Sequence, residues 1–177
     1  MSARHLFVDE TKRRDYLMVA SAHIVTDVAP LRRSLRELLL PNQRYLHMKD
    51  ERDSRKRQIV RAIVVAGVQA TVYRAGAEYR TEKQRREACL RRLVSDNARA
   101  GETVVVFDQD DSLLSWDNQR LIEFTRAEDC RDSFRYEHKT ASAELLLAVP
   151  DAIAWCWAKG GEWKARIRPA VITERDV

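Results

Sequence analysis

Three aspartates that lie far apart in the sequence each stand at one end of an apolar segment. The apolar residues 6–8 run directly into Asp9, and the apolar residues 104–107 run into Asp108. Asp151 opens a third apolar stretch. Carboxylate oxygens are the ligands that Mg²⁺ and Mn²⁺ prefer, and a few suffice because Mg²⁺ keeps several of its waters. Together the three aspartates predict one divalent-metal site.

Metal ions held by such carboxylates are suited to phosphodiester chemistry. Two ions about 4 Å apart can activate a water molecule and stabilise the leaving oxygen. The alternative for each aspartate alone is a helix cap or a turn residue, which is the usual role of Asp at the end of an element. Glu10 follows Asp9 directly, and side chains alternate along a strand. Only one of these two carboxylates is therefore expected to join a given site directly.

Apolar patterning predicts a mixed α/β architecture that could bring the aspartates together. Residues 4–10 and 16–25 flank a short polar turn, which is typical of an antiparallel hairpin. The unbroken apolar character of residues 103–107 suits a central strand covered on both faces. Shorter strands are expected at 45–48, 68–73 and 134–138. Two helices are expected to begin at Thr26 or Asp27 and at Asp53 or Ser54. Further helices are expected to span 78–98, 118–126 and 144–158, and Pro150 is expected to interrupt the last of them. We expect one α/β domain spanning residues 1–177.

Three short motifs in this order resemble the ribonuclease-H-like superfamily. They are Phe7-Val8-Asp9-Glu10-Thr11, Tyr45-Leu46-His47 and Val149-Pro150-Asp151-Ala152-Ile153-Ala154-Trp155. The chain is more specifically similar to an uncharacterised bacterial family. Its members have a first strand ending Asp-Glu-Ser-Gly, a His at the end of a later strand, and an Ala/Pro-Asp-Ala/Leu-Ile-Ala step in the last helix. This chain departs from that pattern where Thr11-Lys12 replaces Ser-Gly.

The resemblance implies a fold and a set of site residues. The fold is a sheet of three antiparallel strands followed by parallel ones, flanked by helices, with a metal site at the strand ends. Asp9, Asp108 and Asp151 would be metal ligands, assisted by Glu10 and His47. His47 could bind the scissile phosphate, move a proton or ligate metal. The alternative for His47 is a half-buried strand residue bonded to a backbone carbonyl.

A different enzyme class also matches one segment. Phe107-Asp108-Gln109-Asp110 resembles the Asp-x-Asp that follows a strand in haloacid-dehalogenase-type phosphatases, where the first Asp is the nucleophile. That motif normally opens its fold, whereas here little chain follows Asp108 to supply the rest of the sheet. We therefore expect Asp110 and Asp111 to bound a loop or to cap the next helix.

Two basic segments are candidates for phosphate contact, which gives salt-dependent and largely sequence-independent binding. The first has no acidic residue after Asp53 and contains Arg52, Arg55, Lys56, Arg57 and Arg61. The second, 80–92, interleaves its arginines with Glu82 and Glu87, as an ordinary solvated helix face does. The first segment is the better candidate for a nucleic-acid contact.

Composition sets further bounds. The 177 residues include 32 Lys plus Arg against 27 Asp plus Glu, a net charge of +5 that permits an anionic partner. The three scattered cysteines lack metal-type spacing and indicate reduced thiols in a cytoplasmic protein. No run approaches the roughly 20 apolar residues of a membrane span, and no membrane partner is expected. Trp155 and Trp157 point to different sides of a helix, so at least one should pack in the core or at a homodimer interface.

These observations predict a metal-dependent phosphodiesterase or nuclease. It would use Mg²⁺ or Mn²⁺ and act on RNA or DNA. The alternative is a non-catalytic nucleic-acid-binding or assembly module on the same fold. Binding by such a module would weaken with salt but would not depend on a divalent metal.

Overall fold

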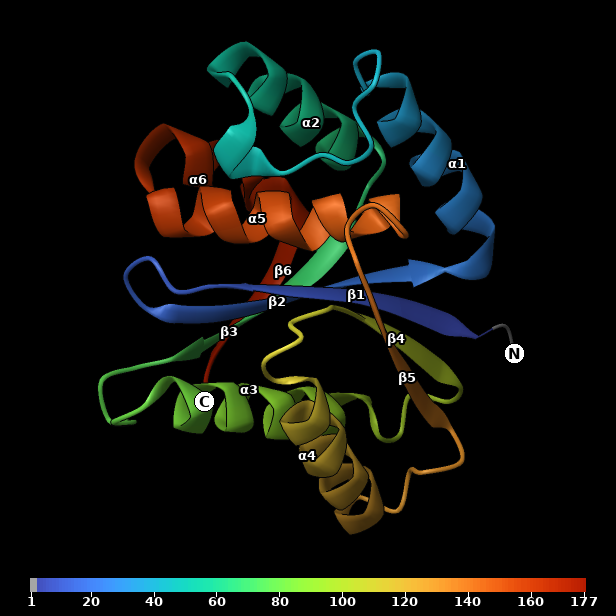
Figure 1. The fold of residues 1–177 in the computed structure, drawn as a ribbon, viewed down its shortest axis with the longest axis vertical. Helices are drawn as coiled ribbons and strands as arrows, with labels where there is room; N and C mark the ends of the chain where they lie inside the picture. The colour runs from blue at the N-terminus through green and yellow to red at the C-terminus, as the bar shows by residue number, and fades with distance from the viewer. Residues whose placement is uncertain (1–2) are drawn as a thin grey trace.

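The computed structural model describes residues 3–177 and contains one mixed sheet (Figure 1). Its strands are β1 (Arg4–Thr11), β2 (Tyr16–Ile24), β3 (Gln69–Ala75), β4 (Thr103–Asp108), β5 (Phe134–Lys139) and β6 (Val171–Asp176). They lie in the order β5-β4-β1-β2-β3-β6. The central strands β1, β2 and β3 are antiparallel, β4 and β5 run parallel to β1, and β6 runs parallel to β3. The predicted α/β class, with an antiparallel hairpin and parallel strands, is confirmed.

Helices cover both faces of this sheet. They are α1 (Val25–Glu37), α2 (Asp53–Val65), α3 (Glu82–Asn97), α4 (Leu114–Ala127), α5 (Ala148–Lys159) and α6 (Gly161–Ile167), with short 3₁₀ helices η1 (Met48–Asp50), η2 (Leu145–Leu147) and η3 (Arg168–Ala170). Figure 1 shows α1, α2, α5 and α6 on one side of the sheet and α3 and α4 on the other. None of the helices within residues 3–177 is both long and apolar enough to cross a membrane.

Strand alternation divides the apolar side chains between two cores. Phe7 and Val106 pack with α1, α2 and α5, whereas Leu6, Val8 and Phe107 pack with α3 and α4. Both faces of β1 and β4 are therefore buried, which explains why their sequences are apolar without a break. The predictions that 4–10 and 16–25 form a hairpin and that 103–107 is a central strand are confirmed.

The predicted strand at 45–48 is wrong. Residues 43–47 belong to no strand, although His47 has an extended backbone, and the chain then enters η1 at Met48. The backbone N–H of Met48 donates instead to the Asp151 carboxylate at 2.8 Å. Burial of Leu46 and Met48 gives this segment the alternating pattern of a strand, but α5 rather than a sheet edge receives it.

Several helix boundaries also differ from expectation. α5 is continuous through Pro150, because this proline lies in the first turn, where no backbone N–H is needed for the helix. α1 and α2 begin at Val25 and Asp53 without a side-chain cap. α3 begins at Glu82, later than expected, after a capping box between Thr81 and Gln84. α6 and β6 are elements that the sequence pattern did not predict.

Buried His23 on β2 makes the stability depend on pH. Its ring lies 5.5 Å from that of Phe7, and its Nε2 is 3.0 Å from the hydroxyl of Ser21. Burial lowers the pKa of His23 from 6.5 to about 4. In the unfolded chain the His23 ring is protonated as the pH falls below about 6.5, whereas in the folded protein it stays neutral until the pH reaches about 4. The stability that neutral His23 contributes is thus fully present above pH 6.5 and is lost as the pH falls.

We expect His23→Gln to reduce this acid sensitivity. Between about pH 7 and pH 4, the free energy of unfolding of the variant should gain up to about 3 kcal/mol relative to wild type. Urea unfolding at a series of pH values measures this difference. A difference that stays constant over the range would contradict the assignment, as would an NMR titration of the His23 ring with a midpoint near 6.5.

Candidate active site

Asp9 and Asp108 lie side by side at the ends of two parallel strands. Phe7 pairs with Val106 and Val8 with Phe107, so the next positions in this register are Asp9 and Asp108. Both aspartates continue the set of side chains that faces α5, because strand positions alternate. The carboxyl ends of parallel strands are the usual ligand-binding edge of an α/β sheet.

Asp151 reaches the same place from the first turn of α5. It lines a cavity of about 410 Å³ together with Asp9, Glu10, Asp108 and His47. The five residues that the sequence singled out as catalytic candidates therefore surround one cavity. Asp9 faces α5, whereas Glu10 forms an ion pair with Arg86 of α3 at 3.1 Å. Both carboxylates nevertheless line the cavity, although strand alternation led us to expect only one of them there.

The cavity concentrates negative charge away from solvent. Only 7% of Asp9 is exposed, and its pKa is raised first by burial and then by the charges of Glu10, Asp151 and Asp108. Burial, Glu10 and Asp151 raise the pKa of Asp108 to about 6, against the opposing effect of His47. Burial also raises the pKa of Asp151. Clustered carboxylates with raised pKa values are typical of sites that bind cations or transfer protons.

Hydrogen bonds fix two of the three aspartates. Asp9 Oδ1 accepts the backbone N–H of Glu10 at 2.8 Å, and Asp151 Oδ2 accepts that of Met48 at 2.8 Å. The other oxygen of Asp151 lies 3.4 Å from His47 Nε2. His47 thus sits between the Asp151 carboxylate and solvent, with 30% of its side chain exposed. The position of His47 is therefore set by the Asp151 carboxylate of α5 and not by pairing of His47 in a strand.

The donor set fits a hard divalent cation in type. Within residues 3–177, no three His, Cys, Asp or Glu side chains are close enough together to form a metal-binding group as they stand. Mg²⁺ does not need a preformed protein cage, since it is usually bound by one or two carboxylates and keeps several waters. Asp9, Asp108 and Asp151 are the residues of this cavity that could hold it.

A buried arginine that the sequence analysis did not single out holds Glu10. Arg86 of α3 is 2% exposed and donates to both carboxylate oxygens of Asp117 at 2.7 Å. It also donates to the Tyr16 hydroxyl at 3.1 Å and lies 3.1 Å from Glu10 Oε1. Arg86 therefore ties α3, α4, β2 and the end of β1 together beneath the cavity.

The position of Arg86 could have been recognised from its spacing. Arg86, Leu90 and Leu93 stand at i, i+4 and i+7, which places the arginine on the apolar stripe of α3 rather than on its solvated face. The segment 80–92 was expected to be a solvated face or a phosphate contact, and for Arg86 this expectation is wrong.

The five basic residues predicted to contact nucleic acid have different surroundings. Lys56 lies over the ring of Trp155, which lines the carboxylate cavity, with Nζ 4.5 Å from the ring centroid. Arg57 lies 5.8 Å from the ring centroid of Trp163. Arg52 and Arg55 line a separate hollow beside His47. Arg61 is exposed farther along α2 and does not line either cavity.

The tryptophans divide as expected between core and surface. Trp157 of α5 is buried in the core on that helix's face of the sheet. Trp155 is half-buried, packs edge-on against Trp163 at 5.3 Å, and forms part of the wall of the carboxylate cavity. Trp155, with Lys56 over its ring, therefore gives the cavity a wall that is both aromatic and cationic.

Comparison with known proteins adds no assignment. No protein-family model matches the chain, and no curated protein matches its sequence. The functional conclusion therefore depends on the cavity itself.

Proposed function

We propose that this protein is a divalent-metal-dependent phosphodiesterase that cleaves nucleic acid on a ribonuclease-H-like fold. The observation that carries the proposal is the meeting of Asp9, Asp108 and Asp151, from three distant segments, around one cavity at the strand ends. The strand order supports the fold, because β3, β2 and β1 form an antiparallel set followed by β4 and β5 parallel to β1.

The three aspartates would hold Mg²⁺ or Mn²⁺. When bound, such ions activate water for attack on phosphorus and stabilise the leaving oxygen. The side chains around them have separate tasks. Asp151 orients His47, which is exposed enough to donate a proton or a hydrogen bond to a phosphate. Arg13 and Lys49 line the same cavity and offer positive charge to the substrate backbone.

The second candidate function is a nucleic-acid-binding module without catalysis. The cationic and aromatic wall formed by Lys56, Trp155 and Arg13 favours it, since this wall could hold a nucleic acid without a metal. Binding by this module would fall with salt and would be unchanged by chelation of divalent ions.

Calorimetric titration of Mg²⁺ and Mn²⁺ tests the proposed function. Wild type is compared with the Asp9→Asn, Asp108→Asn, Asp151→Asn triple variant and with a control that removes the same charge from exposed positions, Asp27→Asn, Asp129→Asn, Asp132→Asn. We expect saturable binding in wild type and the control, and none in the site variant. The Mn²⁺ titration is repeated with a phosphorothioate oligonucleotide, which resists cleavage and whose sulfur Mn²⁺ tolerates, so that a metal recruited together with substrate is also detected.

Cleavage of labelled oligonucleotides with Mn²⁺ is measured on the same three proteins. Cleavage that is lost only in the site variant supports the nuclease. Failure of wild type both to bind metal and to cleave would contradict the proposal, and salt-sensitive oligonucleotide binding in chelator would then identify the binding module.

A further inference from the structure

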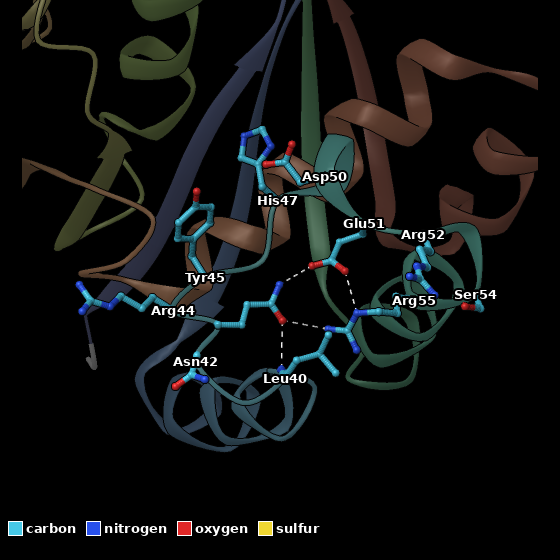
Figure 2. Close-up of a pocket in the computed structure, with 11 residues that line it drawn as sticks. Leu40, Asn42, Arg44, Tyr45, His47, Asp50, Glu51, Arg52, Ser54 and Arg55 are labelled. Carbon is cyan, nitrogen blue, oxygen red and sulfur yellow. Dashed lines mark hydrogen bonds and ion pairs between the residues drawn. The ribbon is translucent and has the colours of Figure 1, made fainter.

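A second hollow of about 720 Å³ lies beside the carboxylate cavity and shares His47 with it (Figure 2). The segment between α1 and η1 forms one wall, and the N-terminal part of α2 forms the other. Because His47 lines both spaces, a ligand that fills the hollow would continue past this side chain toward Asp9, Asp108 and Asp151.

The floor of the hollow is a closed set of hydrogen bonds. Arg55 Nε lies 2.7 Å from Glu51 Oε2, and its NH2 group donates to the carbonyl of Leu38 at 2.6 Å and to Gln43 Oε1 at 3.1 Å. Gln43 in turn donates to Glu51 Oε1 at 2.6 Å. The charges of Arg55 and Glu51 compensate each other, so the floor is fixed and neutral.

The rim carries the groups that are free for a ligand. Tyr45 is 43% exposed, and Arg44 and Arg52 are exposed and form no ion pair within residues 3–177. Figure 2 shows Arg44 and Tyr45 on one side of Glu51 and Arg52 on the other. Asp50 is the acidic residue of the rim, beside His47. With the Arg55–Glu51 pair neutral, the two free guanidinium groups outweigh this single carboxylate.

We propose that the hollow binds one nucleotide of a single-stranded nucleic acid, with its base stacked on Tyr45 and its phosphates held by Arg44 and Arg52. The inference rests on the proposed nuclease function and specifies its substrate. An exposed aromatic ring between free cationic groups is the combination that binds unpaired bases and their backbone. A duplex would first have to unpair and unstack a base to fill the hollow, at a cost of a few kcal/mol.

The carboxylate cavity then holds the phosphate next to the stacked nucleotide. Trp155, with Lys56 over its ring, adds a cationic and aromatic wall to the same cavity. A single strand that stacks on Tyr45 would therefore pass His47 and enter the cavity that Asp9, Asp108 and Trp155 line.

Fluorescence anisotropy in EDTA tests the hollow independently of cleavage. The probes are a labelled oligouridine, its deoxythymidine counterpart and a labelled duplex of equal length. We expect wild type to bind one or both single strands at least about tenfold more tightly than the duplex. Tyr45→Ala should weaken single-strand binding by about 5- to 100-fold, whereas Tyr45→Phe, which keeps the ring, should stay within about twofold.

The arginines are tested by salt dependence. Arg52→Ala should weaken binding of all single-stranded probes to a similar extent and reduce the slope of log affinity against log salt by about 1. Arg126→Ala is the matched control, since Arg126 is an exposed arginine of α4 on the opposite side of the sheet, and its binding should equal that of wild type.

Two results would overturn the inference: equal binding of duplex and single strand, or unchanged binding and cleavage by Tyr45→Ala. Failure of the nuclease proposal gives a different pattern. Binding that depends on Tyr45 without metal-dependent cleavage would support the nucleotide site in the hollow and refute the catalytic function. Cleavage that needs Asp9 but not Tyr45 would support the catalytic function and refute the nucleotide site. Circular dichroism of each variant establishes that it is folded.

Discussion

Asp9→Asn is expected to abolish metal-dependent cleavage and, at the same time, to stabilise the fold. Asp9 is the most buried of the site aspartates, and its charge faces those of Glu10, Asp108 and Asp151. Asn has nearly the same shape and can still accept the backbone N–H of Glu10 through its amide oxygen. The substitution therefore removes a buried negative charge that neighbouring carboxylates repel, and it leaves the packing of the side chain nearly unchanged.

Cleavage should fall by more than about 100-fold, because changes even in residues behind a metal ligand typically cost 10- to 100-fold. The free energy of unfolding without metal should rise by roughly 0.5–2 kcal/mol, as expected when a function-related strain is relieved. Added Mn²⁺ should then stabilise wild type but not the variant, because only wild type binds the ion to its folded state.

Asp132→Asn serves as the control, since this aspartate is exposed in the turn before β5. It should retain both cleavage and stability within about 0.5 kcal/mol. A variant at Asp9 that is destabilised and still cleaves would show that this carboxylate is structural. The opposite signs expected for activity and stability make the result distinct from simple unfolding.

The parts of the fold that the sequence predicted are those whose pattern has a local cause. β1 and β4 are covered on both faces, so their apolar runs are unbroken and end abruptly at Asp9 and Asp108. The stop of α2 at Gly67 was predictable for a similar reason, since its φ of +69° is a conformation that glycine adopts without strain.

The parts that could not be predicted depend on contacts between distant segments. Residues 45–48 have the alternation of a strand, but whether a partner strand lies beside them is a property of the whole sheet. β6 alternates weakly and is charged, and it pairs with β3 only because α5 and α6 carry the chain back across the sheet. Local pattern does not contain this information.

In the candidate site, too, local features could be predicted from the sequence and contacts between distant segments could not. Each of Asp9, Asp108 and Asp151 could be located at the end of its own element from sequence. That all three line one cavity follows from the parallel register of β1 and β4 and from the packing of α5 on them, neither of which is local. The support for Glu10 was missed because an arginine in a charged segment resembles a surface residue until α4 brings Asp117 against it.

Arg86→Met is expected to cause the largest loss of stability of any substitution at this site. Arg86 lies between α3 and α4 with a bidentate bond to Asp117, and both side chains are 2% exposed. Removal of one partner of a buried ion pair leaves the other charge without compensation, which typically costs 3–5 kcal/mol. The hydroxyl of Tyr16 also loses its donor. Arg91→Met, at an exposed position of the same helix, loses only a contact with the Phe124 ring and a long ion pair with Glu87, and should cost no more than about 1 kcal/mol.

A double variant separates the structural role of Arg86 from its effect on the carboxylate cavity. In Arg86→Met, Asp117→Leu, the buried pair is replaced by apolar side chains, and such replacements are often neutral in stability. Urea unfolding should therefore recover at least half of the loss. Glu10 still lacks the guanidinium that lies 3.1 Å from it in wild type, so cleavage should remain about 10- to 100-fold reduced.

The two readouts decide between a scaffold and a positioning residue. If the double variant regained both stability and cleavage, Arg86 would serve only to join α3 to α4, and Glu10 would need no fixed position. Stability regained without cleavage assigns Arg86 the placement of Glu10 beside the aspartates. In that case an apolar pair in place of Arg86 and Asp117 would suffice for folding. The buried charge of Arg86 would then serve to hold Glu10, at the end of β1, in a defined position beside the aspartates.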